Sequence, residues 1–334
     1  MHRSELPPHR SATYVLPRWK VVYVSVPKAA CTSIKWLIAD LQGEDPARFH
    51  GALTREVGRD MTIHRRRRWQ HTPMLHQLPD EELAAISPDE GWFVFALTRH
   101  PSVRLWSAWQ SKFLLREPKW VERFGDAPWF PRLPRTTRDV VEDFQRFARS
   151  MAKNPSELVM RDRHFYPQTG LIAPDRSPYT QIYDTAEIPQ FLEHLAAHLS
   201  AQGWRGTPTL PASNETPLRP LRSMFSPDVV DAIGSVYRED FDRFGYANVI
   251  PDKLEPADGY DDSAIRAIAR LAERGERIGD LALKSQRLFA LTKANQREIK
   301  ELKHRVAQLT AARGLGEGVA GKVRRRMSRA LNRA

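Results

Sequence analysis

The stretch VVYVSVPKAACTSIKWLIADL, from Val21 to Leu41, decides how the first part of the chain is interpreted. It begins with β-branched and aromatic residues, which are typical of a buried strand, and it ends with the apolar spacing of a helix. Between these two parts lie small and polar residues at 27–33, with one lysine and two adjacent hydroxyls. The stretch therefore predicts a strand that leads through a tight turn into a helix.

The turn has the composition of an anion-binding loop. Where a strand feeds a helix, backbone N–H groups and the positive end of the helix dipole point at one place, and that place binds phosphate or sulfate. The central residues of the turn are small enough for a ligand to approach the backbone, the lysine supplies a mobile cation, and the hydroxyls are donors. The candidate binding residues are Pro27, Lys28, Ala29, Ala30, Cys31, Thr32 and Ser33.

This turn is not a Walker A motif. In the pattern G-x-x-x-x-G-K-[ST] the lysine follows the glycines, whereas Lys28 precedes the small residues and no glycine is present. The interpretation as a P-loop-like nucleotide-dependent kinase is therefore weakened, but it stays open as an alternative. On this stretch alone, an ordinary strand–turn–helix joint with a chance lysine is a second alternative.

A second strand–loop–helix segment strengthens the anion-binding interpretation. The strand-like run 91–97 is followed by Arg99, and Ser107 lies two turns into the helix that comes next. A guanidinium can hold a phosphate through two parallel hydrogen bonds, and a hydroxyl can donate to the same group. Two such loops at one sheet edge fit a nucleotide that carries two separated anionic groups.

The rest of the chain up to residue 252 continues to alternate strand-like and helix-like sequence. This alternation predicts an α/β domain with a mainly parallel central sheet flanked by helices. The segment 117–134 is rich in Pro, Trp and Phe, so we expect an irregular loop there that contributes to an acceptor pocket. The expected strands are 20–26, 91–97 and 179–183, and the expected helices are 31–41, 99–115, 137–150, 188–200 and 226–244.

The chain is expected to have four parts. Residues 1–18 are polar and read as a flexible arm, and 19–252 would form the α/β domain. Residues 258–312 lack the aromatic density of the domain and predict a long helix or coiled coil, whose polar interruptions would set the register. The segment 313–334 then combines glycines, expected to form a hinge, with a basic tail. The apolar heptad positions are Ile278, Leu281, Leu288, Ile299, Leu302, Val306 and Leu309.

Composition limits the location and the partners. The 334 residues include 41% hydrophobic residues, enough for a sizeable core, and the formal charge of +12 favours an anionic partner. The single cysteine excludes an internal disulfide and favours a reducing compartment. We see no signal peptide and no apolar run long enough to span a membrane, which predicts a cytoplasmic protein.

The quoted segments resemble those of sulfotransferases that use 3′-phosphoadenosine 5′-phosphosulfate (PAPS). Residues 27–35, PKAACTSIK, resemble the loop that binds the 5′-phosphosulfate, and Arg99-His100-Pro101-x-x-Arg104-x-x-Ser107 resembles the 3′-phosphate site. The resemblance is to the carbohydrate group that includes the chondroitin 4-O- and glucuronyl-type enzymes. It extends over about 20–247, with weaker similarity at 164–168, 211–216 and 237–246. Ala30 stands where that group has glycine, and no membrane anchor is present, which suggests a bacterial member.

The resemblance implies a P-loop-like sulfotransferase domain that transfers a sulfuryl group from PAPS to a carbohydrate hydroxyl by in-line displacement, without a metal. It implies that Lys28 acts on the leaving phosphate, that the loop 27–33 holds the 5′-phosphosulfate, and that Arg99 and Ser107 hold the 3′-phosphate. In such enzymes a histidine between the two motifs often serves as the base. The preferred candidate is His64, which follows a short strand-like run, with His71 second and His164 third.

Other functions are less consistent with the residues. The spacing of His64, His71 and His76 matches no zinc pattern. The basic run 65–68 lacks the interleaved aromatics of a nucleic-acid site and predicts a patch for an acidic acceptor or a solvated face. A non-catalytic scaffold remains an alternative, with 278–309 forming a homo-oligomer and 322–334 lying on an anionic membrane surface. Scaffold and enzyme are compatible, in which case the protein would be peripheral at the inner membrane face.

Overall fold

The structure is a computed structural model that describes residues 12–49, 61–155, 160–211, 217–247, 254, 259–312 and 317–331. The chain forms two units, 1–275 and 276–334. The first unit therefore extends beyond residue 252, where the sequence placed the end of the domain.

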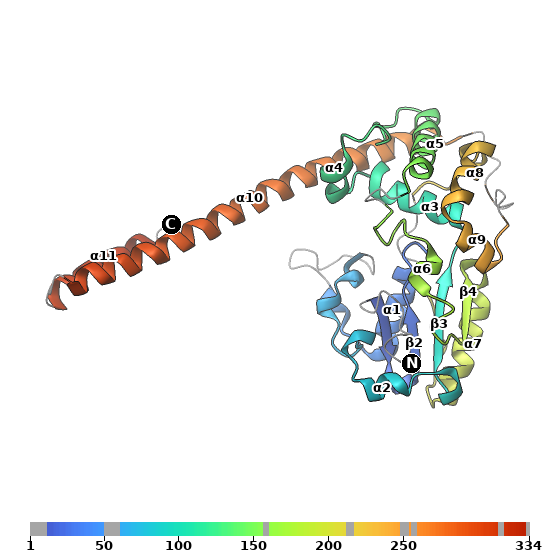
Figure 1. The fold of residues 1–334 in the computed structure, drawn as a ribbon, viewed down its shortest axis with the longest axis horizontal. Coiled ribbons are helices and arrows are strands. Elements are labelled where there is room, and N and C mark those ends of the chain that lie inside the picture. Colours follow the sequence, from blue (N-terminus) through green and yellow to red (C-terminus); the bar gives the residue numbers. More distant parts are fainter. Residues whose placement is uncertain are drawn as a thin grey trace. The chain divides into compact units, whose positions relative to one another are not determined.

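A four-stranded sheet forms the centre of the first unit, with the strands in the order β1-β2-β3-β4 (Figure 1). The pairs β2–β3 and β3–β4 are parallel, and β1 pairs antiparallel with β2. The expectation of a mainly parallel sheet is confirmed. The strands are β1 (Thr13–Leu16), β2 (Val21–Val24), β3 (Phe93–Thr98) and β4 (Gln181–Asp184).

The expectation that residues 1–18 form a flexible arm is wrong for the part that contains strand β1. Its four residues TYVL are all buried, and each pairs with a residue of β2. The turn back to β2 uses a short 3-10 helix followed by Lys20 in a left-handed conformation. An alternating apolar run of only four residues is a weak strand signal, and here tertiary burial decides the outcome. Residues 1–11 lie outside the described part of the chain.

The two faces of the sheet are covered by different segments, as their alternating side chains require. Tyr23 and Phe95 face one cluster that includes apolar residues of α1 (Cys31–Gln42) and α7 (Ile188–Ala201). Val22 and Val94 face another cluster, which is closed by residues between Leu75 and Ile86, around the short helix α2 (Asp80–Ala84). Both faces are therefore buried, as expected for parallel strands.

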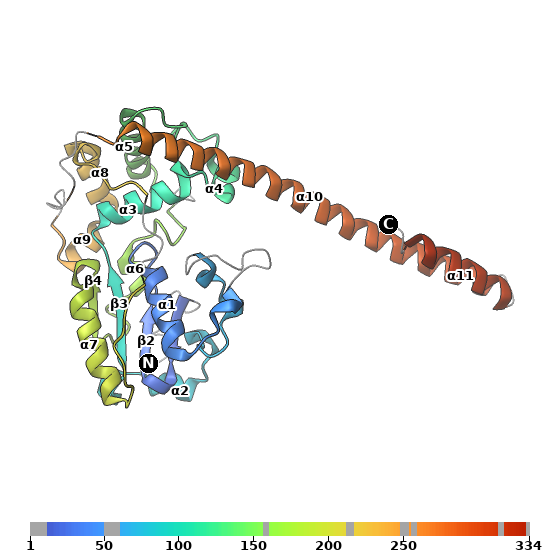
Figure 2. The same ribbon diagram turned by 180° about the vertical axis from the view of Figure 1, so that it is seen from behind.

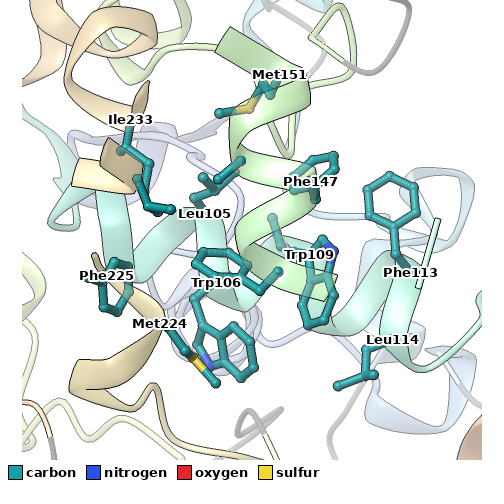
Figure 3. Packing of buried hydrophobic residues seen from close by; sticks show 14 of the residues in the cluster. Leu105, Trp106, Trp109, Phe113, Leu114, Phe147, Met151, Met224, Phe225 and Ile233 are labelled. Carbon is teal, nitrogen blue, oxygen red and sulfur yellow. The ribbon is translucent and has the colours of Figure 1, made fainter. Parts of the chain in front are cut away.

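A helical layer lies beyond the end of β3, and Figure 2 shows it from the opposite side. Its core is aromatic (Figure 3). Trp106 lies 5.3 Å from Trp109 and 5.2 Å from Phe144, measured between ring centroids. Rings of this size each contribute about 1.5–3 kcal/mol when fully buried. The layer comprises α3 (Pro101–Trp109), a π-helical turn (Gln110–Leu114), α4 (Pro118–Phe124), α5 (Thr137–Lys153), α8 (Pro227–Val236) and α9 (Arg238–Phe244).

Two expectations for this layer are wrong. The segment 117–134 contains the helix α4, and its Trp120 and Trp129 pack edge-on against Phe113 instead of forming an open loop. The expected single helix 226–244 is two helices separated at Tyr237. Tyr237 is buried at this break, and its hydroxyl donates to the carbonyl of Phe165 at 2.6 Å.

The remaining elements of the first unit are short. They are the 3-10 turns Pro17–Trp19, Pro46–Phe49, Met61–His64, Arg66–Arg68, Leu75–Gln77, Pro88–Glu90, Thr185–Glu187 and Arg222–Met224, and the helix α6 (Gln168–Ile172).

The helix α10 (Asp262–Ala312) begins in the first unit and continues into the second. Ile265, Ile268 and Ala272 are buried, the first two in the aromatic core, which explains why the domain extends past residue 252. The expected glycine hinge is not seen where it is described, since Gly318 and Gly321 lie inside α11 (Glu317–Leu331). The segment 313–316 lies outside the described residues.

In the second unit, α10 exposes apolar side chains along its length. Five of the seven heptad positions are among the exposed large apolar residues, namely Ile278, Leu281, Leu288, Leu302 and Leu309. Among the described residues, no helix has both the length and the apolar character that a membrane span requires.

Candidate active site

A cavity of about 920 Å³ opens where the loops after β2 and β3 meet. Carboxyl ends of parallel strands are the usual place for a ligand site in an open α/β sheet. Most lining residues come from the β2–α1 loop and the start of α1, the segment 64–66, the segment 99–112, the segment 162–164 and the segment 218–220. Those used below are Pro27, Lys28, Ala30, Cys31, Thr32, Ser33, Lys35, His64, Arg66, Arg99, Ser107, Lys112, Asp162, Arg163, His164 and Arg219.

The loop 27–33 has the geometry of an anion-binding turn. Lys28 and Ala30 have φ angles of +70° and +52°, so the chain turns sharply before α1 begins. Ala30 is the N-cap of α1 and provides no side-chain cap. The first N–H groups of a helix have no partner within the helix, and the positive end of its dipole lies at the same place. The turn therefore presents positive potential to the cavity, and Ala30 adopts a positive φ where the resembling group has glycine.

Arg104, which the motif comparison associates with the 3′-phosphate site, has a structural role here. Its side chain is buried, its Nε donates to the carbonyl of Pro27 at 3.1 Å, and its Nη2 donates to the carbonyl of Arg163 at 3.0 Å. Arg163 in turn donates to the carbonyl of Ser25 at 2.7 Å. The two arginines join the end of β2 and its loop to α3 and to the 162–164 segment.

Arg99 lies next to the first loop, as the nucleotide interpretation requires. Its Nη1 donates to the carbonyl of Lys28 at 3.3 Å. The backbone of Arg99 is fixed by the buried amide of Gln168, which accepts from its N–H at 3.0 Å and donates to its carbonyl at 2.9 Å. Asp240 in α9 accepts from the N–H groups of Gln168 and Thr169, both at 2.8 Å.

Cations crowd the cavity wall between the two loops. Lys112, in the π-helical turn, lines the cavity near Ser107 and forms an ion pair with Glu117. Burial lowers the pKa of Lys28 to about 8, and repulsion from Lys112 and Arg99 acts in the same direction. A bound anion would favour the protonated form of Lys28, because opposite charges nearby raise the pKa of an amine. The unfavourable crowding of cations is thus relieved when an anion binds.

His64 reaches the cavity from a 3-10 turn, Met61–His64, and not from the short strand that the sequence suggested. Its Nε2 lies 3.1 Å from Oγ1 of Thr32, and its Nδ1 lies 2.9 Å from Nζ of Lys35. Burial, reinforced by the charge of Lys35, lowers the pKa of His64 to about 2. His64 is therefore neutral, and it contacts the first residues of α1 next to the loop 27–33.

The other two candidate histidines differ in position. The side chain of His71 is exposed and is not among the residues that line the cavity. Its backbone is held elsewhere, because the carboxylate of Glu44 accepts from the N–H groups of Gln70 and His71. The expected role of His71 as a base is not supported by this position. His164 does line the cavity, and its Nδ1 lies 2.6 Å from a carboxylate oxygen of Asp162.

The sequence did not assign roles to Gln168, Asp162 or Asp240. Gln168 and Asp240 lie in segments noted only for weak similarity, and the sequence around them does not distinguish them from neighbouring polar residues. Both are fully buried. Buried polar groups are nearly always hydrogen-bonded, so a partner elsewhere in the chain was to be expected, although its identity was not.

Comparison with known proteins agrees with this geometry. Residues 11–247, more than half of the chain, match the model of a family described as the sulfotransferase family. The chain belongs to the sulfotransferase family. No curated protein and no solved structure matches it. This sulfotransferase is thus an enzyme of sulfuryl transfer, and both loops that meet at the cavity, with the segment 162–168, lie inside the matched region.

Proposed function

We propose that the protein transfers a sulfuryl group from PAPS to a hydroxyl of a carbohydrate or glycoconjugate. The observation that carries this proposal is the 3.3 Å hydrogen bond from Arg99 Nη1 to the carbonyl of Lys28, which brings two anion-binding loops to one cavity. PAPS has two separated anionic groups, a 5′-phosphosulfate and a 3′-phosphate. The family typically uses this donor, and the cavity offers cationic and hydroxyl groups for both ends.

The loop residues take the following roles in the proposal. The backbone at 29–33, with the hydroxyls of Thr32 and Ser33, would hold the 5′-phosphosulfate at the start of α1. Lys28 would donate a hydrogen bond to the phosphate oxygen that becomes the leaving group and stabilise its developing charge. Arg99 and Ser107 would hold the 3′-phosphate, and a guanidinium suits a phosphate through two parallel N–H donors. Ser107 is buried except for its surface in the cavity.

The acceptor in this proposal carries an acidic group. Arg66 and Arg219 line the cavity and are exposed, so their side chains can reach a ligand from the solvent side of the cavity. A guanidinium recognises a carboxylate or a sulfate well. None of the described lining residues comes from 117–134, so the expected contribution of that segment to the acceptor pocket is replaced by these arginines.

The test has two arms. Calorimetry should show that the full chain binds adenosine 3′,5′-bisphosphate more tightly than ATP, and the reverse order would favour a kinase. Labelled sulfate should pass from PAPS to one or more members of a panel of acidic and neutral glycans, and Lys28→Ala should reduce the transfer by two orders of magnitude or more. Absence of bisphosphate binding by the unmodified chain would refute the proposal.

We also propose roles for the second unit. In this proposal 278–309 forms a homo-oligomer through the heptad positions of α10, and 322–334 binds an anionic membrane surface, which places a cytoplasmic enzyme at the inner membrane face. Light scattering on the full chain should give a mass above that of the monomer, and Leu288→Glu should lower it. Flotation with vesicles containing phosphatidylserine should fail when Arg324, Arg325 and Arg326 are replaced by glutamate.

A further inference from the structure

Two histidines line the cavity, and their hydrogen bonds give them different chemical capacities. His64 lies between Thr32 and Lys35, and His164 contacts Asp162. A neutral imidazole has one N–H donor and one acceptor nitrogen, and the partners of the two nitrogens decide which is which. A general base needs an acceptor nitrogen that is free to face the substrate.

In His64 both nitrogens are already used. The lysine ammonium can only donate, so Nδ1 of His64, 2.9 Å from Lys35 Nζ, must be the acceptor. The neutral ring then carries its proton on Nε2, which donates to Oγ1 of Thr32 at 3.1 Å. No acceptor nitrogen remains for a substrate hydroxyl. His64 is a positioning residue that orients Thr32 and Lys35 in the anion-binding loop.

In His164 the assignment is reversed. Burial raises the pKa of Asp162, but the hydrogen bonds from His164 and the charge of Lys119 outweigh it and hold this pKa well below its usual range. An ionised carboxylate only accepts, so Nδ1 of His164, 2.6 Å away, carries the proton. Asp162 also accepts from the backbone N–H of His164 at 3.0 Å, which fixes the ring further. The acceptor nitrogen of His164 is therefore Nε2.

The surroundings keep this ring neutral until charge is added. Burial lowers the pKa of His164 to about 4, the lysines of the cavity act in the same direction, and Asp162 opposes them. A neutral ring is the form that can accept a proton at neutral pH. An anionic donor beside the lysines would raise the pKa and improve the driving force for proton uptake. The charged and titratable groups that act on the ring are Asp162, Lys112, Lys28 and His64.

We propose that His164 is the catalytic base of sulfuryl transfer and that Asp162 is its positioning residue; this rests on the proposed function. The acceptor oxygen forms a bond to sulfur while the bond between sulfur and the leaving phosphate oxygen breaks. That phosphate oxygen keeps the electron pair of the broken bond and is stabilised by Lys28. The hydroxyl proton passes to Nε2 of His164, and the carboxylate of Asp162 balances the imidazolium that forms.

The first test reads the tautomers without any substrate. Long-range nitrogen–proton spectra of the full chain labelled with ¹⁵N-histidine should show the Nδ1–H form for His164 and the Nε2–H form for His64. His164→Gln and His64→Gln assign the two signals. Asp162→Asn should change the tautomer mixture of His164 and leave that of His64 unchanged. An Nε2–H form for His164 in the unmodified chain would overturn the proposal.

The second test measures turnover of labelled PAPS with a glycan mixture, where release to water and transfer to sugar are counted together. His164→Gln should lower turnover about 100-fold or more, the usual contribution of a general base, with the affinity for adenosine 3′,5′-bisphosphate within threefold of the unmodified chain. Asp162→Asn should lower turnover less and shift its pH profile. The matched control is His76→Gln, an exposed histidine outside the cavity lining, which should change neither quantity.

The outcomes separate the two proposals. If the unmodified chain neither binds the bisphosphate nor turns over PAPS, the proposed function fails and the base assignment fails with it. If the unmodified chain is active and His164→Gln keeps more than a third of its turnover, only the base assignment fails. In the second case the variant His64→Gln is informative. It should weaken bisphosphate binding if His64 acts only by positioning the loop.

Discussion

Replacing Ala30 with glycine should stabilise the protein, which is unusual for a substitution to glycine inside an ordered loop. The φ angle of Ala30 is +52° and its ψ angle is +19°, which lies in the left-handed region. For an L-residue with a side chain this conformation costs about 1–2 kcal/mol. Glycine removes that cost, and it increases the entropy of the unfolded chain by about 0.4–1 kcal/mol. After the loss of a half-buried methyl, a net gain of about 0.5 kcal/mol remains.

Ala29 is the matched control for this prediction. It is adjacent, fully buried, and not among the described residues with positive φ. Ala29→Gly therefore loses a buried methyl, worth about 0.8 kcal/mol, with no strain to relieve, and the unfolded-chain entropy adds to the loss. The two variants should differ by about 2 kcal/mol in the free energy of unfolding, with opposite signs relative to the unmodified chain.

Urea denaturation followed by tryptophan fluorescence measures this difference on the full chain. The midpoint should rise for Ala30→Gly and fall for Ala29→Gly, with an unchanged slope if the surface exposed on unfolding is the same. The affinity for adenosine 3′,5′-bisphosphate should be measured on the same variants. We expect it to be unchanged in Ala30→Gly, because glycine preserves the turn that presents the backbone N–H groups. If Ala30→Gly lowers the midpoint as much as Ala29→Gly does, the left-handed geometry assigned to this loop is wrong.

Three further predictions concern the contacts around the cavity. Gln168→Leu should lower the free energy of unfolding by about 2–3 kcal/mol and weaken bisphosphate binding, because the backbone of Arg99 loses both hydrogen bonds; unchanged urea midpoints would contradict it. Arg104→Lys should cost about 1–3 kcal/mol in the same assay, because one ammonium replaces a guanidinium that binds two separated carbonyls. Bisphosphate affinity should fall as pH rises through about 8, where Lys28 loses its charge, and Lys28→Arg should remove that dependence in calorimetry.

The three parallel strands and the two strand–loop–helix joints could be predicted from the sequence because their signals are local. A β-branched run followed by small residues and an apolar helical spacing identifies the β2–α1 segment within a single stretch. The same holds for the β3–α3 segment. The structure agrees at each of these places.

The rest depended on contacts between distant residues. Strand β1 has only four residues and is recognisable mainly through its pairing with β2. The segment 117–134 looked like a loop because Pro and Trp are poor helix signals, yet burial of Trp120 against Phe113 organises it. The role proposed for each histidine also depends on side chains that the sequence does not pair, since Lys35 contacts His64 while Asp162 contacts His164.

The contact between Gln168 and Asp240 has a consequence for biosynthesis. Arg99 is held by Gln168, and the N–H of Gln168 is held in turn by Asp240, which lies near the end of the region that matches the family. During translation, the strands β1 to β4 leave the ribosome well before α9 does. A nascent chain can therefore build the sheet early, but the second anion-binding loop gains its final support only when about three quarters of the polypeptide has been synthesised. Truncation by a premature stop codon before α9 should accordingly yield chains in which Gln168 contacts Arg99 without the support of Asp240.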